Sequence, residues 1–337
     1  MKAWEIRGDG GIDALTLSER EDPEPGPGEV LVRITASSIN YRDLTTIEDP
    51  APRSIPYPRI PNSDGAGTVI ATGDGVTRFS TGDLVCGTFF QGWIDGPITA
   101  LDMGRALGGT AEGMLAQLRV LPEDGLVHAP PGLSGRDAAT LPCAALTAWH
   151  SLVEVGRVGP GDTVLLLGTG GVSIMALQFC GMLGARAIIT SSSDVKLERC
   201  AELGAWATVN YRRTPEWDRE VVRLTDGRGV DHTVEVGGAG TLARSIAATR
   251  IAGSIGLIGV LTGGTINPTL IMRKSLRLQG VYVGSRRMFE DMNRAIAHHG
   301  MRPVIDRCFD LADARAAYHA MRAAGHFGKL VITVAQD

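Results

Sequence analysis

The sequence predicts an α/β protein that combines a β-rich domain with a doubly wound parallel-sheet domain. Two observations indicate this fold class. The first 120 residues contain β-branched runs separated by turn residues, whereas strands and helices alternate regularly from residue 161 onward. A glycine-rich turn, "LLLGTGGVS" at 165–173, joins the first strand of the alternating region to its first helix. Such an alternation is typical of parallel sheets, whose strands are connected by crossover helices.

Three β-branched runs define the N-terminal region: "VLVRIT" (30–35), "AGTVIAT" (66–72) and "DLVCGTFF" (83–90). The segments "PEPGPGE", "GDG" and "STGD" between them predict turns, because glycine and proline favour the backbone angles that turns require. "PPGLSG" (130–135) then marks a break. The sequence "RDAATLPCAALTAWHSL" after this break has the apolar spacing of a helix.

The alternating region predicts a parallel sheet over about 145–267. Its expected strands are 162–168, 186–191, 207–211, 230–238 and 253–260, with helices between them. Gly184 suits the C-terminal cap of the first of these helices. Ser193 or Asp194 suits the N-cap of the second, and Thr214 followed by Pro215 is expected to begin the third.

The segments on either side of this sheet are expected to form one further domain. The predicted boundaries are 131–267 for the parallel-sheet domain and 1–130 with 268–337 for the β-rich domain. The last segment adds "RLQGVYVG", helices at 287–299 and 311–324, and the final strand "GKLVITV". A cleft between two domains is the natural place for a ligand.

Composition and charge exclude several classes of partner. The 337 residues are 44% hydrophobic and 21% charged with a net charge of −4, which predicts a globular protein without general affinity for nucleic acid or membranes. No apolar run approaches the roughly 20 residues of a membrane span, and no signal peptide is evident. The five cysteines are scattered and form no C-x-x-C pair, so a reducing, cytoplasmic location is expected.

The glycine-rich turn predicts a dinucleotide site. Backbone amides at the start of the following helix can approach a pyrophosphate closely where no Cβ intervenes. The strict G-x-G-x-x-G pattern requires glycine at 173, where this chain has Ser173, but the surrounding strand–helix alternation supports the interpretation. The residues expected to contact the cofactor here are Gly168, Thr169, Gly170, Gly171 and Val172.

The end of the second strand, "ITSSSDVK" (189–196), predicts which nicotinamide cofactor is used. NAD-specific sites place a carboxylate there, whereas this chain has serines and no acid before Asp194, which suits a helix cap. A 2′-phosphate would instead receive hydrogen bonds from Ser191 and Ser192 and charge from Lys196. Tyr211, with Arg212 beside it, follows the neighbouring strand and could reach the same phosphate. The sequence therefore predicts NADPH.

Nearly the whole chain resembles the medium-chain dehydrogenase/reductase superfamily. The matching pieces are "INYRDL", "GAGTVIATGDGV", "LPCAALTAWHSL", "GDTVLLLGTGGVSIMALQFC" and "GHFGKLVITV". Within the superfamily the chain looks most like the zinc-free quinone oxidoreductase and enone reductase branch. The resemblance implies a GroES-like catalytic domain, a Rossmann cofactor domain and a homodimer that pairs the sheet edges late in this domain.

The resemblance further implies a zinc-independent, NADPH-dependent oxidoreductase that transfers hydride to an activated alkene, a quinone or a carbonyl of a small molecule. A metal-free alcohol dehydrogenase or carbonyl reductase is the enzymatic alternative. An NADPH-binding protein without turnover, like the lens proteins derived from this branch, is the non-enzymatic one. The fold does not decide among these substrates, because substrate contacts lie in loops without a readable code.

The resemblance also bears on metal binding. Zinc-dependent relatives carry a cysteine where this chain has Asn40, a His-Glu pair where it has Ser63–Asp64, and a third ligand that matches Cys143. A catalytic zinc needs three protein ligands. His150 lies seven residues beyond Cys143, but these two side chains alone are too few. We therefore expect no metal.

Other cofactor contacts carry over from the resemblance by position. Thr147 is expected near the nicotinamide, and Lys329 matches a basic residue that contacts the pyrophosphate. Gly237 and Gly238 are expected to follow the fourth strand near the adenosine side. Val260, Leu261, Tyr282 and Val283 match backbone stretches beside the nicotinamide ring.

The segment "NYRD" at 40–43 holds the candidate catalytic residues. Hydride transfer builds negative charge on the acceptor oxygen, and fixed hydrogen-bond donors lower that barrier. Tyr41 carries a phenol that is protonated at neutral pH, Asn40 an amide and Arg42 a guanidinium. Ser63 is a weaker candidate, and Asp43 is expected to orient one of these groups or to bond backbone amides. Alternatively, this run is structural capping and pairing.

Overall fold

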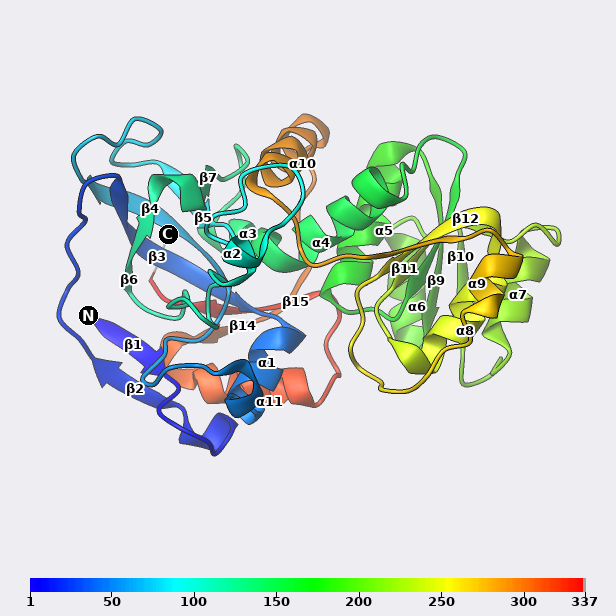
Figure 1. Ribbon diagram of the computed structural model, residues 1–337, viewed down its shortest axis with the longest axis horizontal. Helices are drawn as coiled ribbons and strands as arrows, with labels where there is room; N and C mark the ends of the chain where they lie inside the picture. The colour runs from blue at the N-terminus through cyan, green and yellow to red at the C-terminus, as the bar shows by residue number, and fades with distance from the viewer. Residues whose placement is uncertain (336–337) are drawn as a thin grey trace. The chain divides into compact units, whose positions relative to one another are not determined.

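The computed structural model describes residues 1–335, which divide into two compact units (Figure 1). The β-rich unit comprises Met1–Leu146 and the chain from Gly284 onward, and the parallel-sheet unit comprises Thr147–Val283. The two-segment arrangement agrees with the sequence prediction, but the predicted boundaries, after residues 130 and 267, fall before those observed. The first boundary lies later because α3 (Gly135–Ala138) and the π-helix Leu141–Ala145 pack against strands of the β-rich unit.

A seven-stranded sheet forms the framework of the β-rich unit. Its strands, in spatial order, are β14 (Ile305–Asp310), β15 (Lys329–Thr333), β3 (Glu29–Ile39), β4 (Asp64–Thr72), β5 (Leu84–Gly87) and β7 (Leu126–His128), with β6 (Leu118–Pro122) also paired to β3. The pairs are antiparallel except β14 with β15, which is parallel. A separate antiparallel pair consists of β1 (Lys2–Glu5) and β2 (Thr16–Glu19).

The helices of this unit are short apart from α10 and α11. They are α1 (Tyr41–Glu48), α2 (Ala100–Met103), α3, α10 (Arg286–His299) and α11 (Ala314–Arg322), with 3-10 turns at Ile12–Ala14, Ala51–Arg53, Glu123–Gly125 and Leu311–Asp313. One core lies where α11 packs against both α1 and β15. α11 contributes Ala314, Ala317, Tyr318 and Met321, whose spacing places them on one face of the helix. This packing fixes the strand that carries Lys329 and the helix that begins at Tyr41.

The second unit is a six-stranded parallel sheet. In spatial order its strands are β10 (Ala207–Asn210), β9 (Arg186–Ser191), β8 (Thr163–Leu167), β11 (Val230–Glu235), β12 (Thr249–Leu257) and β13 (Arg277–Gly280). The chain starts at β8, runs outward to β10 and returns to β11 beside β8, so the strand order reverses between β8 and β11. The doubly wound parallel sheet predicted from the sequence is therefore present, and the point of reversal is where such sheets bind ligands.

Two details of this unit correct the sequence prediction. β13 was assigned to the β-rich domain, but it pairs in parallel with β12 as the sixth strand of this sheet. The helix after β10 does not begin at Thr214–Pro215, because the Thr214 amide donates to the Asn210 carbonyl in a turn and α7 (Trp217–Leu224) starts later. The caps at Ser193 and Gly184 are confirmed. The other helices are α4 (Leu146–Trp149), the π-helix His150–Val155, α5 (Gly171–Leu183), α6 (Asp194–Glu202), α8 (Ala239–Ala248) and α9 (Thr269–Arg273).

No helix within residues 1–335 is both long and apolar enough to cross a membrane.

An ion network around the buried Asp231 carboxylate, at the start of β11, gives the stability of this unit a dependence on pH. The Asp231 carboxylate accepts hydrogen bonds from the Arg228 guanidinium at 2.5 and 2.9 Å, from the Arg250 Nε at 2.6 Å and from the Thr163 amide at 3.0 Å. Burial alone would raise the pKa of Asp231, but these donors outweigh it and lower the pKa from 3.8 to about 2.

We expect this network to contribute stability above pH 4 that is lost as the pH falls toward 2. The folded pKa lies below the unfolded value, so the unfolded chain binds the proton first. The wild type should lose roughly 2 kcal/mol of unfolding free energy over this interval. Urea unfolding at a series of pH values measures this loss. The unfolding free energy of Asp231→Asn should fall less steeply with pH than that of the wild type. Equal slopes for the two proteins would contradict the expectation.

Candidate active site

The predicted cofactor residues of the parallel-sheet unit gather at one edge of its sheet. Because all six strands run in the same direction, their carboxyl ends lie on the same side. The sequence places a predicted contact after each strand: residues 168–172 follow β8, 191–196 follow β9, Tyr211 follows β10, 237–238 follow β11, 260–261 follow β12 and 282–283 follow β13. Thr147 is buried in α4.

The glycine-rich turn leaves the start of α5 open. Gly168 has φ of +71°, a backbone conformation that favours glycine, and Gly170 occupies the N-cap of α5. A Cβ built at either glycine would meet no atom within 4 Å. No side chain caps the helix. The first amides of α5 can therefore be approached by a phosphate, and the dinucleotide contact at this turn stays a prediction.

Ser173 explains how the turn departs from the strict glycine pattern. The third glycine of that pattern allows the helix to pack closely against the strand. Here the Ser173 hydroxyl is buried and donates to the Leu167 carbonyl at 2.6 Å, so it ties α5 to the end of β8 by a hydrogen bond. The amide of Gly168 also donates to the Thr190 hydroxyl at 3.4 Å, which links this turn to the end of β9.

Asp194, the first acid after β9 in the sequence, is engaged elsewhere. The Asp194 carboxylate accepts a hydrogen bond from the Asn210 amide at 2.7 Å and is paired with Arg213. The Ser193 hydroxyl caps α6 by accepting from the Lys196 amide. Ser191 is buried, Ser192 and Lys196 are half-buried, and Tyr211 is exposed, with its amide donating to the Ser191 carbonyl at 3.0 Å.

Glu235 is a residue of this edge that the sequence analysis missed. Its carboxylate, fully buried at the end of β11, accepts from the amides of Gly237 at 2.7 Å and Gly238 at 3.1 Å, and from the hydroxyls of Thr241 and Ser245. The sequence signal was an acid at the end of a predicted strand, one residue before two glycines. Glu235 therefore shapes the turn that holds the predicted adenosine contacts.

The predicted nicotinamide contacts include one residue in an unusual conformation. Val283 has φ of +58°, which is rare for a β-branched residue. Its carbonyl accepts a hydrogen bond from Nδ1 of His150 at 2.7 Å. Burial lowers the pKa of His150, although this hydrogen bond opposes the shift. Val260, Leu261 and Tyr282 are exposed.

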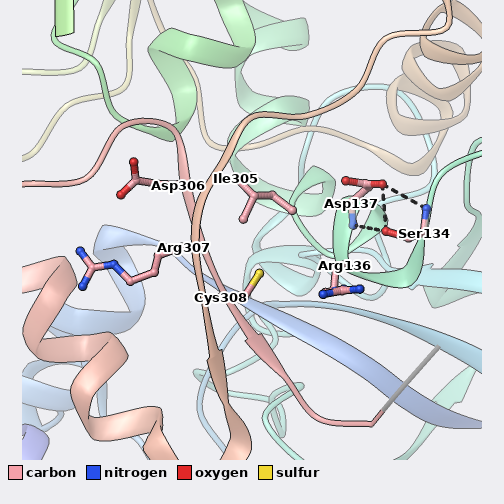
Figure 2. Close-up of a pocket in the computed structure, with 7 residues that line it drawn as sticks. All are labelled: Ser134, Arg136, Asp137, Ile305, Asp306, Arg307 and Cys308. Atoms are coloured by element: carbon pink, nitrogen blue, oxygen red, sulfur yellow. Dashed lines mark hydrogen bonds between the residues drawn. The ribbon is translucent and has the colours of Figure 1, made fainter. Parts of the chain in front are cut away.

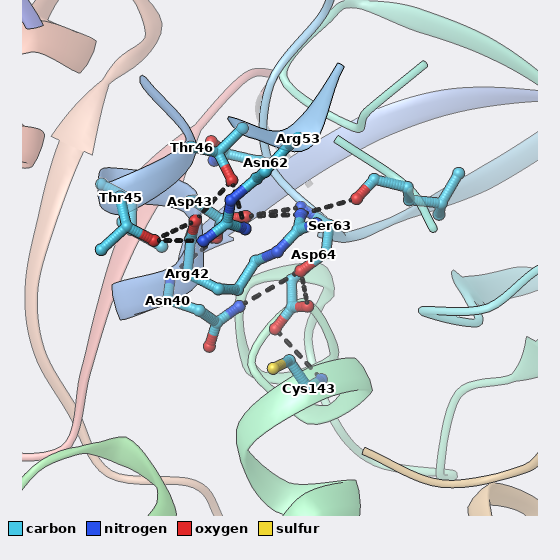
Figure 3. Close-up of polar contacts among 12 residues, drawn as sticks. Asn40, Arg42, Asp43, Thr45, Thr46, Arg53, Asn62, Ser63, Asp64 and Cys143 are labelled. Atoms are coloured by element: carbon cyan, nitrogen blue, oxygen red, sulfur yellow. Dashed lines mark hydrogen bonds and ion pairs between the residues drawn. The ribbon is translucent and has the colours of Figure 1, made fainter. Parts of the chain in front are cut away.

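In the β-rich unit, Asn40, Ser63 and Asp64 lie together in a buried polar cluster with Lys329 (Figure 3 shows the first three). The Lys329 ammonium donates to Oδ1 of Asn40 at 2.5 Å and lies 3.8 Å from Oδ2 of Asp64. Nδ2 of Asn40 donates to the Ser63 hydroxyl at 3.4 Å, and that hydroxyl donates to Oδ1 of Asp64 at 2.8 Å. We call these four residues the polar cluster.

Lys329 was predicted to contact a pyrophosphate, but here its ammonium also donates to the Ile39 carbonyl at 3.0 Å. The pyrophosphate contact stays a prediction, for which the ammonium has a third N–H besides those given to Ile39 and Asn40.

Asp43 connects residues of the polar cluster to Arg42, whose guanidinium donates to Oδ1 of Asp43 at 3.1 Å. The Asp43 carboxylate accepts from the backbone amides of Asn40 at 2.8 Å and Ser63 at 3.1 Å, so its predicted role in bonding backbone amides is confirmed. Arg42 donates to the Leu107 carbonyl at 2.7 Å and stacks over Phe89, which is a structural use of the guanidinium. Tyr41 begins α1, is 42% exposed and has no hydrogen-bond partner in the described chain.

The donor set of the polar cluster does not fit a catalytic zinc. Oδ1 of Asn40 is used by an ammonium, and that cation would repel a second one. Burial raises the pKa of the Cys143 thiol, which opposes the thiolate that zinc requires. His150 belongs to the parallel-sheet unit, where its Nδ1 bonds the Val283 carbonyl. Among residues 1–335, no group of three or more His, Cys, Asp or Glu side chains is arranged to hold a metal.

A hollow of about 370 Å³ lies beside the edge strand β14 and contains none of the predicted site residues (Figure 2). It is lined by Ser134, Arg136, Asp137, Ile305, Asp306, Arg307 and Cys308. The Asp137 carboxylate is occupied by the Ser134 hydroxyl at 2.8 Å in a helix cap. This hollow is therefore not a candidate for the active site.

Comparisons with known proteins agree with these two units. The zinc-binding dehydrogenase family matches residues 171–298, and the alcohol dehydrogenase GroES-like domain matches residues 26–131. A zinc-type alcohol dehydrogenase-like protein of Schizosaccharomyces pombe is 42% identical over 96% of both chains. A structure from Sinorhizobium meliloti 1021, assigned as an alcohol dehydrogenase, is 40% identical with a TM-score of 0.92 and covers 99% of this chain and 98% of its own. An NAD-dependent alcohol dehydrogenase structure is 34% identical with a TM-score of 0.90 over 99% and 100%.

A GroES-like unit joined to a six-stranded dinucleotide-binding sheet defines an NAD(P)-dependent oxidoreductase. The chain belongs to the medium-chain dehydrogenase/reductase superfamily, among the zinc-type alcohol dehydrogenase-like proteins. A quinone oxidoreductase of Pseudomonas aeruginosa is a more distant relative, 29% identical over 96% of both chains. The superfamily expected from the sequence is confirmed, whereas the assignment to the quinone oxidoreductase and enone reductase branch stays a prediction.

Proposed function

We propose that this protein is a zinc-independent, NADPH-dependent oxidoreductase that reduces an activated alkene, a quinone or a carbonyl. The observation that carries the proposal is the polar cluster. Where zinc-dependent relatives were inferred to hold their metal, this chain has an amide, a hydroxyl and a carboxylate, with the Lys329 ammonium bonded among them. This arrangement supports chemistry by hydrogen-bond donors rather than by a metal.

NADPH, when bound, supplies a hydride from C4 of its nicotinamide. The residues of the chain then have two tasks. They orient the acceptor, and they stabilise the negative charge that develops on its oxygen. We assign the second task to Tyr41 and Asn40: the Tyr41 phenol has no partner to give up within the described residues, and the Asn40 amide is already fixed by its neighbours. Arg42 and Ser63 are proposed only to support these two groups, because Arg42 is used structurally and Ser63 is fully buried.

The proposed preference for NADPH is supported by the end of β9. Ser191 and Ser192 offer hydroxyls, Lys196 offers a charge, and Asp194 is neutralised by Arg213. A carboxylate facing the ribose would repel a 2′-phosphate. The name of one structural relative, an NAD-dependent alcohol dehydrogenase at 34% identity, makes NADH the alternative to be tested.

The proposal is tested by incubating chelator-treated protein with NADPH and an α,β-unsaturated ketone and identifying the product. A saturated ketone supports zinc-free alkene reduction. An allylic alcohol means that hydride reaches the carbonyl carbon, which supports the metal-free alcohol dehydrogenase or carbonyl reductase instead. Loss of turnover after chelation, restored by zinc, would overturn zinc independence. Stoichiometric NADPH binding without oxidation across acceptors would favour a binding protein.

We also propose a homodimer that pairs at the edge strand β13. Large apolar side chains are exposed beside this edge, among them Ile266, Leu270 and Met272, which is 67% exposed. Monomers seldom expose such patches. Sedimentation should give twice the chain mass of 35.6 kDa, and Leu270→Glu with Met272→Glu should shift the protein toward 35.6 kDa. A wild-type protein that sediments as a monomer at micromolar concentration would refute the dimer.

A further inference from the structure

Lys329 is an unusual lysine because its charge is buried inside the β-rich unit. The side chain is 2% exposed, at the start of β15. Its ammonium donates to the Ile39 carbonyl at 3.0 Å and to Oδ1 of Asn40 at 2.5 Å, and it lies 3.8 Å from Oδ2 of Asp64. A buried charge is costly unless it is paired and hydrogen-bonded, so these contacts make up an organised site and not a solvated surface lysine.

The ammonium decides which way the Asn40 amide faces. An ammonium can only donate, so the atom of Asn40 that faces it must be the oxygen. The amide nitrogen must then face the opposite side, where it donates to the Ser63 hydroxyl at 3.4 Å. Without Lys329, the amide could rotate by half a turn and present its oxygen instead of its N–H groups.

Asp64 is the counter-charge that keeps Lys329 in place. Its carboxylate is fully buried and accepts from the Ser63 hydroxyl at 2.8 Å, the Ser38 hydroxyl at 3.3 Å and the Cys143 amide at 3.3 Å. Burial raises the pKa of Asp64, and the Lys329 ammonium acts in the opposite direction. The two charges therefore support each other.

We propose that Lys329 is a positioning residue that holds the Asn40 amide with its N–H side available to the reacting oxygen, in the place where zinc-dependent relatives hold their metal. This inference rests on the proposed function. Lys329 does not touch the substrate in this scheme. It acts through Asn40, and Asp64 keeps its charge balanced.

The test compares Asp64→Asn with the double variant Asp64→Asn/Lys329→Met, because Lys329→Met alone leaves a buried carboxylate without its cation and is expected to fold poorly. The double variant should melt within about 5 °C of Asp64→Asn and bind NADPH within about threefold, but its kcat should be at least 10-fold lower. In a protein that already carries Asn40→Ala and Asp64→Asn, adding Lys329→Met should lower kcat no further, since Lys329 acts through Asn40.

Lys274→Met is the matched control. The Lys274 ammonium also bonds carbonyls, those of Ile246, Ala247 and Thr249, but it bonds no predicted site residue.

The side-chain amide resonances of Asn40 give a second measurement that does not depend on turnover. They should shift and exchange faster with solvent when Lys329→Met is added to Asp64→Asn. The proposal would be overturned by unchanged Asn40 resonances or by an unchanged kcat. It would also be overturned if Lys329→Met lowered kcat by the same factor with and without Asn40→Ala. A tenfold weaker NADPH affinity with kcat intact would overturn it too, in favour of the pyrophosphate contact. If the wild type reduces no acceptor, the proposed function fails, and the amide resonances still decide whether Lys329 orients Asn40.

Discussion

Replacing Tyr41 by phenylalanine is expected to lower kcat for reduction of an α,β-unsaturated ketone about 100-fold, which corresponds to roughly 2.7 kcal/mol of transition-state stabilisation. The phenol lies at the start of α1, directly after Asn40, and no described group competes for its proton. Phenylalanine keeps the ring and removes only the donor. NADPH affinity and thermal stability should therefore stay unchanged, and kcat should fall more than KM rises.

Tyr57→Phe is the matched control for this variant. Tyr57 belongs to the same unit and is similarly exposed, at 43% against 42%, but its hydroxyl donates to Asp9 at 3.1 Å. We expect a change in kcat of less than about twofold for the control. Steady-state kinetics of both variants with the same ketone make the comparison. If Tyr41→Phe keeps full activity, the proton comes from another source, and Asn40 remains as the proposed donor to the developing oxyanion.

The parts of the fold that follow from local pattern were predictable from the sequence. The β8–turn–α5 segment was one of these, because an apolar strand, a glycine turn and an apolar helix follow one another without interruption. β13 was placed in the wrong domain for the opposite reason: it is a short, largely exposed strand whose sequence does not show which sheet it joins. The start of α7 was missed because a turn hydrogen bond from Thr214 to Asn210 competes with the cap that the sequence suggested.

In the candidate site, too, the features set by local sequence were predictable and those set by long-range contacts were not. The residues after β8 to β12 could be placed at one sheet edge from the sequence, since the order of these strands along the chain was predicted, whereas Tyr282 and Val283 after β13 came only from the resemblance. The hydrogen bonds that hold the site could not be predicted, because they join residues far apart in the sequence. Lys329 and Asn40 are 289 residues apart, and His150 and Val283 are 133 residues apart. Lys329 at a strand start resembles a solvated lysine in sequence. Only the packing of β15 beside β3 brings its ammonium to Asn40.

Charge reversal at Lys196 is the second large effect that we expect, and it tests the cofactor assignment. Lys196→Glu should weaken NADPH binding about 100-fold, or roughly 2.7 kcal/mol, and NADH binding by less than about threefold. The reason is that only NADPH carries a 2′-phosphate, and the end of β9 then presents a carboxylate to it. We expect no rearrangement of Asp194 that would offset this repulsion, since its carboxylate is already held by Asn210 and Arg213.

Cofactor titrations followed by quenching of protein fluorescence, at a fixed salt concentration near 0.1 M, measure both affinities. Lys196→Gln removes the charge without reversing it and should fall between the wild type and Lys196→Glu. Lys2→Glu makes the same change of net charge on an exposed residue of the β-rich unit, so it separates a local effect from a general one. Equal losses for NADPH and NADH in Lys196→Glu would show that Lys196 does not face the 2′-phosphate. The serines at the end of β9 would then carry no preference between the two cofactors, because a hydroxyl can accept from a ribose as readily as it donates to a phosphate.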